Sequence, residues 1–179
     1  MSQTNAPWNV FLPLNTCGGI LAIPNVNIGD VAYGSVGTNT TDVDGQLWVT
    51  DIFVPFSKRI TKIAFLQGAT ATTDKTLVAL YDAEGTLLSK SAVAGATLSG
   101  ANTFQEQTLL TPLDVYGPTQ LYVAVQGNGT AAGAIRTMKA STVVNRCAGA
   151  IAGVFGTVPT KITVPTTFTA DEGPIVYLA

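Results

Sequence analysis

The sequence contains no histidine, and that absence alone excludes the most common chemistry of enzyme sites. Histidine is the usual general base near neutral pH, the usual partner of a catalytic serine or cysteine, and a frequent zinc ligand. Cysteine is almost as scarce, because Cys17 and Cys147 are the only two. Two thiols cannot form a zinc site made of cysteines alone. We therefore expect a protein that is not an enzyme and that carries no metal or other cofactor.

Charged residues are also few. They make up 11% of the 179 residues, less than half the usual share of about 25%, and the net charge is −2. Lys58 and Arg59 are the only adjacent basic pair, which gives no basic patch for DNA or RNA. No apolar run reaches the length of a membrane-spanning helix, and the first residues lack the positive segment of a secretion signal. We expect neither nucleic acid nor a membrane as a partner.

The two cysteines lie far apart in the sequence, without a spacing that indicates a disulfide. A bond between Cys17 and Cys147 remains open as an alternative. A protein made in a reducing cytoplasm keeps its thiols separate, so we favour two free cysteines.

The residues that are abundant indicate strands. Apolar residues make up 46% of the chain, and threonine, whose β-branched side chain suits strands, occurs 26 times. The length is sufficient for one domain with a single core. We assign residues 31–179 to one β-sandwich domain and residues 1–30 to an extended N-terminal arm. The arm contains Pro7, Pro13 and Pro24 without a regular apolar period, and its large side chains, which need a surface to cover, are our candidate interface residues: Trp8, Phe11, Leu12 and Leu14.

The clearest element is a strand, turn and strand over residues 75–92. Residues 77–81 form an unbroken apolar run, which is typical of a strand that is covered on both faces. Asp82 and Gly85 supply turn chemistry, because aspartate bonds its own turn backbone and glycine accepts a positive φ. We therefore predict a bulged hairpin here, with its first strand in the centre of a sheet.

Turn residues divide the remaining chain into short strands. We predict both faces of residues 46–54 to be buried, with Trp48 on one face and Leu47 on the other, and we expect Pro112 to end the strand at 104–110. Residues 127–129 should reverse the chain into a strand at 133–139. The full prediction is about eight to nine strands, with further strands at 30–34, 60–66, 121–126 and 174–179 and loops at 37–45, 68–74 and 140–165.

Carboxylates are the remaining candidates for catalysis. A glycosidase needs two of them facing each other across a cleft. Glu84, Glu106 and Glu172 are the only glutamates, and each has a simpler interpretation in a turn, on a polar strand face or in a loop. Asp42, Asp44 and Gly45 resemble the start of a calcium loop, but the later ligand positions are not met, and an Asx turn explains them better.

Two further motifs have a structural explanation as well. Gly127, Gly129 and Gly133 follow a predicted strand, but their spacing and the next strand do not fit a dinucleotide-binding loop. Asn39 and Asn128 begin glycosylation sequons that a cytoplasmic protein does not use. A sugar-stacking platform is an alternative for the aromatic residues, although packing in the core or at an interface is favoured for each: Trp8, Trp48, Tyr33, Tyr81 and Tyr122.

The order of motifs over residues 44–179 resembles a module of structural proteins in the virions of tailed bacteriophages. The motifs are TDK before a strand, the LYDAEG hairpin, the SAVAG turn, the segment GPTQLYVAVQGNGT and the terminal GPIVYLA. The resemblance implies a jelly-roll-like antiparallel β-sandwich that decorates or cements a capsid, or that forms part of a head fibre or tail. It brings no catalytic residues.

This resemblance leads to our expectation for function. We expect a non-enzymatic virion protein, assembled in the host cytoplasm, that contacts other capsid or tail subunits and forms a homo-oligomer, with a trimer favoured. The alternative is a carbohydrate-binding β-sandwich or adhesin that binds a receptor.

Overall fold

A computed structural model describes residues 33–97, 99–129, 133–139 and 147–179 of the chain. The predicted arm at residues 1–30 lies outside these residues, together with Trp8, Phe11, Leu12 and Leu14. The division into an arm and one domain therefore stays a prediction.

The described residues form an all-β fold, as the sequence predicts. Tyr33–Ser35 form a short 3-10 turn, η2, instead of the end of the strand predicted at 30–34. The strands are β1 (Thr38–Thr41), β2 (Leu47–Val54), β3 (Lys58–Leu66), β4 (Lys75–Tyr81), β5 (Leu87–Lys90), β6 (Ala96–Thr97), β7 (Phe104–Val115), β8 (Thr119–Gly127), β9 (Ala134–Thr137), β10 (Ala148–Ile151) and β11 (Val176–Leu178).

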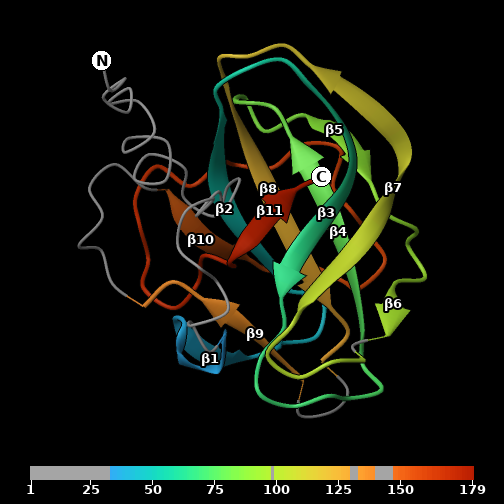
Figure 1. Cartoon of the computed structure of the whole chain (residues 1–179), viewed down its shortest axis with the longest axis vertical. Helices are drawn as coiled ribbons and strands as arrows, with labels where there is room; N and C mark the ends of the chain where they lie inside the picture. Colours follow the sequence, from blue (N-terminus) through green and yellow to red (C-terminus); the bar gives the residue numbers. More distant parts are fainter. Residues whose placement is uncertain (1–32, 98, 130–132, 140–146) are drawn as a thin grey trace, which may run out of the picture.

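The largest sheet has six antiparallel strands in the order β10-β2-β8-β4-β5, and β6 also pairs with β4 (Figure 1). Its centre is formed by β8 between β2 and β4. Leu47 pairs with Gln126 and Val54 with Thr119, while Thr76 pairs with Gly127 on the other side. The predicted central position of residues 75–81 is therefore confirmed.

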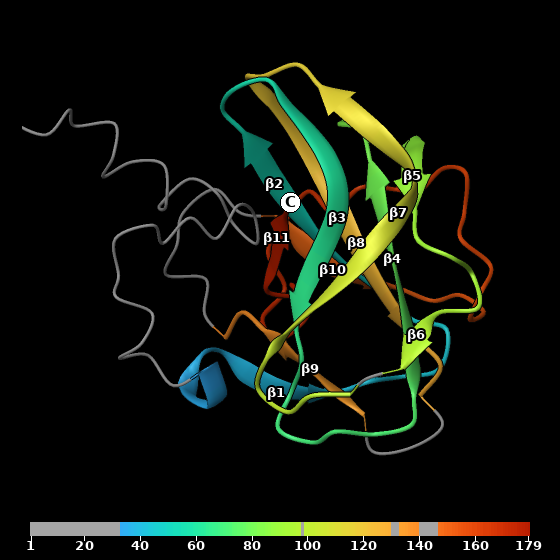
Figure 2. The same cartoon turned by 45° about the vertical axis from the view of Figure 1, so that its right-hand side comes forward.

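A second sheet, in the order β11-β3-β7, faces the large one, so the fold is a sandwich-like pair of layers (Figure 2). The core between them is made of alternate side chains from both sheets, as period-2 strands require. Its members are Trp48, Ile52, Val54, Ile60, Ile63, Phe65, Val78, Leu80, Leu109, Val115, Leu121, Val123, Val125, Ile135, Val176 and Leu178.

The opposite face of the large sheet is buried as well, under the chain that follows β10. A second apolar cluster there joins Leu47, Val49 and Tyr81 to Val158 and Ile162. The Tyr81 hydroxyl donates a hydrogen bond to the Pro159 carbonyl at 3.1 Å. This loop explains why β2 and β4 are apolar on both faces, which is the pattern that the sequence showed.

The hairpin over residues 75–92 has the predicted turn. Asp82 Oδ1 accepts hydrogen bonds from the backbone N–H groups of Glu84 and Thr86, at 3.0 and 2.7 Å. Gly85 has a φ of 80°, and the pairing of β4 with β5 shifts register between Leu80 and Tyr81. The predicted bulge is therefore confirmed.

One prediction about the second sheet is wrong. Pro112 does not end β7, because residues 109–112 lie where the register with β3 shifts and have no pairing partner there, so the missing N–H removes no ladder bond. The register jumps from Ile60–Leu113 to Lys62–Thr108. This irregularity also turns Ile60 into the core beside Ile63, whereas strict alternation predicts the two on opposite faces.

The small sheet of β1 and β9 corrects two more predictions. Residues 37–45 are not all loop, since Thr38–Thr41 pair with Ala134–Thr137. The sequence also predicts a hairpin between β8 and β9. Instead, β9 pairs with β1, a strand almost one hundred positions earlier in the chain. The predicted loop at 140–165 likewise contains β10, which pairs with β2.

Candidate functional site

The glutamates are separated, and two of them have structural partners. Glu84 is exposed in the hairpin turn. Glu106 forms a 2.7 Å ion pair with Lys62 and accepts a 2.7 Å hydrogen bond from the Tyr177 hydroxyl. These two contacts hold the pKa of Glu106 below its usual range. Glu172 accepts a 2.8 Å hydrogen bond from the Ala150 N–H. None of the three faces another across a cleft.

Asp42 is the residue of the predicted Asx turn that the structure buries most. Its Oδ1 accepts hydrogen bonds from the Val43 N–H at 3.0 Å and from Trp48 Nε1 at 3.4 Å. Its Oδ2 has no hydrogen-bond partner among the described residues. Burial, opposed by these bonds and aided by the nearby Asp74, raises the pKa of Asp42 to about 6. In the described ranges no three metal-ligating side chains gather.

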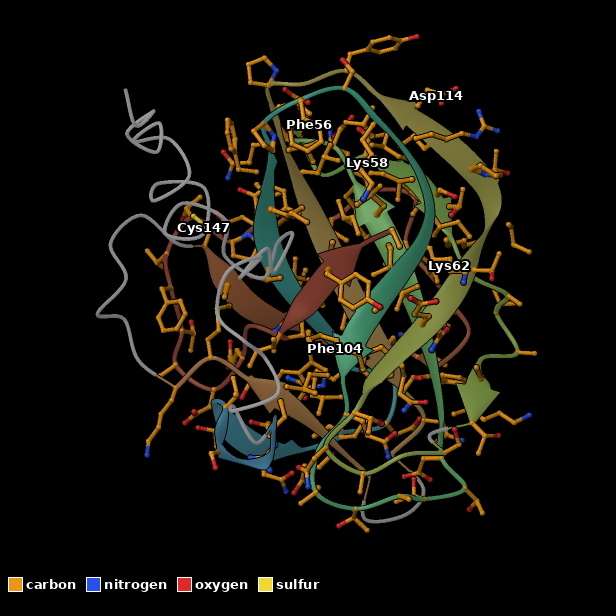
Figure 3. All side chains as sticks on the ribbon, in the orientation of Figure 1. Phe56, Lys58, Lys62, Phe104, Asp114 and Cys147 are labelled. Atoms are coloured by element: carbon orange, nitrogen blue, oxygen red, sulfur yellow. The ribbon has the colours of Figure 1, made fainter. Side chains whose placement is uncertain are left out.

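A second buried carboxylate, Asp51, lies on β2 opposite Tyr122 of β8, on the face covered by the C-terminal chain. Burial raises the pKa of Asp51 to about 6, and Oδ1 has no hydrogen-bond partner in the described part of the chain. Cys147, a free thiol that is labelled in Figure 3, is close enough to interact with both residues, and burial together with Asp51 raises its pKa. A thiol with a raised pKa is a poor nucleophile, so the cluster lacks the activation that catalysis needs. The partner proposed for it in the alternative disulfide, Cys17, lies outside the described residues.

Three of the five aromatic residues considered for a stacking platform are buried and do not form one. Trp48, Tyr81 and Tyr122 are buried in the two apolar clusters. Tyr33 begins η2, and Trp8 lies outside the described residues.

Two other aromatic side chains are exposed together at one end of the sandwich. Phe56, which is labelled in Figure 3, is 56% exposed in the β2–β3 loop, and Tyr116 is 80% exposed at the start of the β7–β8 loop. The loops touch, since a Cβ on Gly117 would lie 2.6 Å from the Phe56 backbone. We call the end formed by Phe56 and Tyr116 the aromatic tip. Sequence reasoning missed it, although a large aromatic residue next to Pro55 and another before Gly117 place both in turns, outside any strand.

The aromatic tip is uncharged. The nearest charged residues along the two loops are Lys58, Arg59 and Asp114. Arg59 and Asp114 neutralise each other in an exposed 3.0 Å ion pair, and the Lys58 ammonium donates to the Leu178 carbonyl at 2.8 Å. Further apolar exposure occurs along the neighbouring edges of the two sheets, at Leu88 of β5 and at Leu110 of β7, which is 64% exposed. A surface of this kind is suited to apolar packing and not to electrostatic attraction.

Comparison with protein-family profiles, curated proteins and solved structures finds no match for this chain. In the described residues no helix is long and apolar enough to cross a membrane.

Proposed function

We propose that this chain is a non-enzymatic structural protein of a tailed-phage virion, a capsid decoration, cement or head-fibre protein that acts through protein–protein packing. The sequence motifs at residues 44–179 provide the resemblance. The observation that carries the proposal is the aromatic tip, where Phe56 and Tyr116 leave much of their apolar surface in water without a charged group between them. Large exposed aromatic residues are enriched at protein interfaces.

The strand order supports the jelly-roll part of the proposal. In the large sheet β8 lies between β2 and β4, and β3 pairs with β7 in the facing sheet. The chain therefore passes from one layer to the other between β2 and β3, back between β3 and β4, and again between β7 and β8. Such alternation between two layers is the connectivity on which jelly rolls are built.

Symmetry would increase the contribution of a small contact. Two aromatic side chains bury too little area for a stable complex of one copy. A homo-oligomer, with a trimer favoured, presents several aromatic tips at once, and their binding energies add through the linkage.

The first prediction concerns the tip. We expect Phe56→Ser with Tyr116→Ser to reduce binding of the purified protein to particles that lack it by at least about tenfold, because interface aromatics dominate binding energy. Sedimentation with the particles followed by gel quantification measures the bound fraction. The thermal unfolding midpoint should change little, since both side chains are already in water.

Val93→Ser is the matched control, because Val93 is also an exposed apolar residue but lies in the turn before β6. It should bind like the unchanged protein. Equal binding by the double variant and the control would contradict the proposal. Binding to an array of glycans that the double variant loses would instead support the alternative, a carbohydrate-binding adhesin.

A further inference from the structure

The edge strand β11 has one side that no described strand occupies. It ends the order β11-β3-β7, so β3 is its only neighbour among the strands that the structure describes. Lys62 and Ala179 exchange two hydrogen bonds, at 3.0 and 2.9 Å, and the Leu66 N–H donates to Ile175 at 2.8 Å. In an antiparallel ladder, hydrogen-bonded pairs alternate with pairs whose backbone groups point away from each other. Val176 and Leu178 lie between those bonded positions, so they direct their N–H and C=O groups away from β3.

Only one of these outward groups has a partner among the described residues. Lys58 Nζ donates to the Leu178 carbonyl. The N–H and C=O groups of Val176 and the N–H of Leu178 have none there, although both residues are buried, with 0% and 3% exposure. Buried backbone groups in folded proteins are almost always paired. This edge is therefore a place for one more strand.

The residues on the two faces beside this edge indicate which side chains a pairing strand needs. On the inner side, β10 presents the small Ala150, which packs on the core but is only partly buried. On the outer side, Tyr177 lies against Phe104, with ring centroids 5.0 Å apart. A fitting strand has large apolar residues facing inward above Ala150 and an aromatic residue facing outward beside Tyr177.

We propose that residues 8–12 of the same chain, with the sequence WNVFL, add to the free edge of β11. Alternation places Trp8, Val10 and Leu12 on one face and Phe11 on the other, which matches the inner and outer requirements. Pro7 and Pro13 bound the segment, and prolines are tolerated at edges. Residues 1–29 contain no charge, so burying this segment removes no ionised group from water.

The segment just before β1 lies next to β11, which supports a contact within one molecule. Gly37 is packed against the Thr137 carbonyl, and a Cβ there would lie 3.1 Å from the Ile175 side chain, next to the start of β11. Residues 13–32 connect the two, and twenty residues are enough to span the distance, since a random chain of that length has an end-to-end distance of roughly 25 Å. The effective concentration of a tethered segment is in the millimolar range, so it outcompetes a second copy in dilute solution.

Hydrogen exchange of the Val176 and Leu178 amides in the full-length protein, followed by NMR, tests the proposal. The inward residues of an added antiparallel strand direct their N–H toward β11, so Val10→Pro removes a pairing donor. We expect both amides to be protected in the unchanged protein and to exchange about tenfold faster or more in this variant. Val26→Pro, which changes the same arm outside the segment, is the control and should leave the exchange rates unchanged.

The amides of β4 report whether the sandwich stays folded in each variant. Equal exchange at Val176 and Leu178 in the unchanged protein and the Val10→Pro variant would overturn the proposal.

Isotope-filtered NOEs on a mixture of labelled and unlabelled protein identify the source of the strand. NOEs from Val10 to Val176 within one molecule support the proposal, whereas NOEs only between molecules would show that a second copy occupies the edge. The particle-binding test of the aromatic tip is separate, so either proposal can fail alone.

Discussion

Asp42 and Asp51 each bury a carboxylate with one oxygen that has no hydrogen-bond partner in the described part of the chain. Their neighbours come from distant parts of the sequence, such as Gly129 beside Asp42 and Cys147 beside Asp51. The sequence predicts a polar turn at Asp42 and assigns no role to Asp51. Neither raised pKa can be predicted from local sequence, because burial arises only when distant strands pair.

The second prediction follows from the sign of these shifts. The folded pKa of about 6 exceeds the ordinary value of 3.8, so folding favours the protonated form of Asp51. The contribution of Asp51 to the free energy of unfolding is therefore highest below about pH 4, decreases as the pH rises to about 6, and stays lower above. We expect Asp51→Asn to flatten this part of the profile and to raise stability at pH 7.5 by on the order of 2 kcal/mol.

Urea unfolding between pH 4.5 and 7.5 measures this effect. Asp44→Asn, at an exposed loop position, is the matched control and should keep the pH dependence of the unchanged protein. A loss of stability at pH 7.5 in Asp51→Asn would mean that the hydrogen bonds of the carboxylate, such as the one that Oδ2 accepts from Gln120 Nε2 at 3.4 Å, outweigh the cost of its burial, contrary to our interpretation.

At the scale of elements, the sequence predicts best where the interactions are local. The bounds of β4 and the bulged turn after it follow from an apolar run, Asp82 and Gly85, which lie within a few residues of one another. The strand Thr38–Thr41 is polar and is held by β9, so no local pattern indicates it. Pro112 misleads for the same reason, since its tolerance depends on where β3 stops pairing with β7.

The third prediction concerns the hairpin turn. Gly85 has a φ of 80°, and an added Cβ would clash with the Ile162 carbonyl, which belongs to the covering loop. We expect Gly85→Ala to lower the free energy of unfolding by roughly 2 kcal/mol or more, because it combines backbone strain with displacement of that loop. Glu84→Ala, an exposed change in the same turn, should cost less than about 0.5 kcal/mol. Chemical denaturation compares the two, and equal costs would contradict the prediction.

At the scale of the whole molecule, the large sheet is a middle layer with apolar contacts on both sides. Sequence analysis predicts that β2 and β4 are covered twice, but it assigns residues 140–165 to a loop without identifying that loop as the cover. Glycine, alanine, valine and threonine alternate there without a regular apolar period, so the sequence does not show that Val158 and Ile162 pack on the sheet. The candidate site escaped prediction in a similar way, because Phe56 and Tyr116 are far apart in sequence and meet only when the two layers join.

The fourth prediction tests the cover. Ile162 is 6% exposed against Tyr81 and its neighbours, so Ile162→Ala should reduce the free energy of unfolding by about 2–4 kcal/mol. Val154→Ala, in the same loop but 69% exposed, should change it by less than about 0.5 kcal/mol. Thermal and urea unfolding provide the comparison. A small effect at Ile162 would mean that the loop rests on the sheet without stabilising it.

The strand order also determines how the chain reaches this state. Apart from the β4–β5 hairpin, the long ladders join segments that are many tens of residues apart, as in the pairing of Leu47 with Gln126 and of Lys58 with Val115. Each such pairing must close a large loop, and the entropy lost in closing it comes before the stabilising contacts form. The hairpin is therefore expected to form first, and the layers assemble around it slowly, on a timescale of milliseconds to seconds. During that interval apolar strands are open to neighbouring chains, and the yield of native protein depends on keeping newly made chains apart.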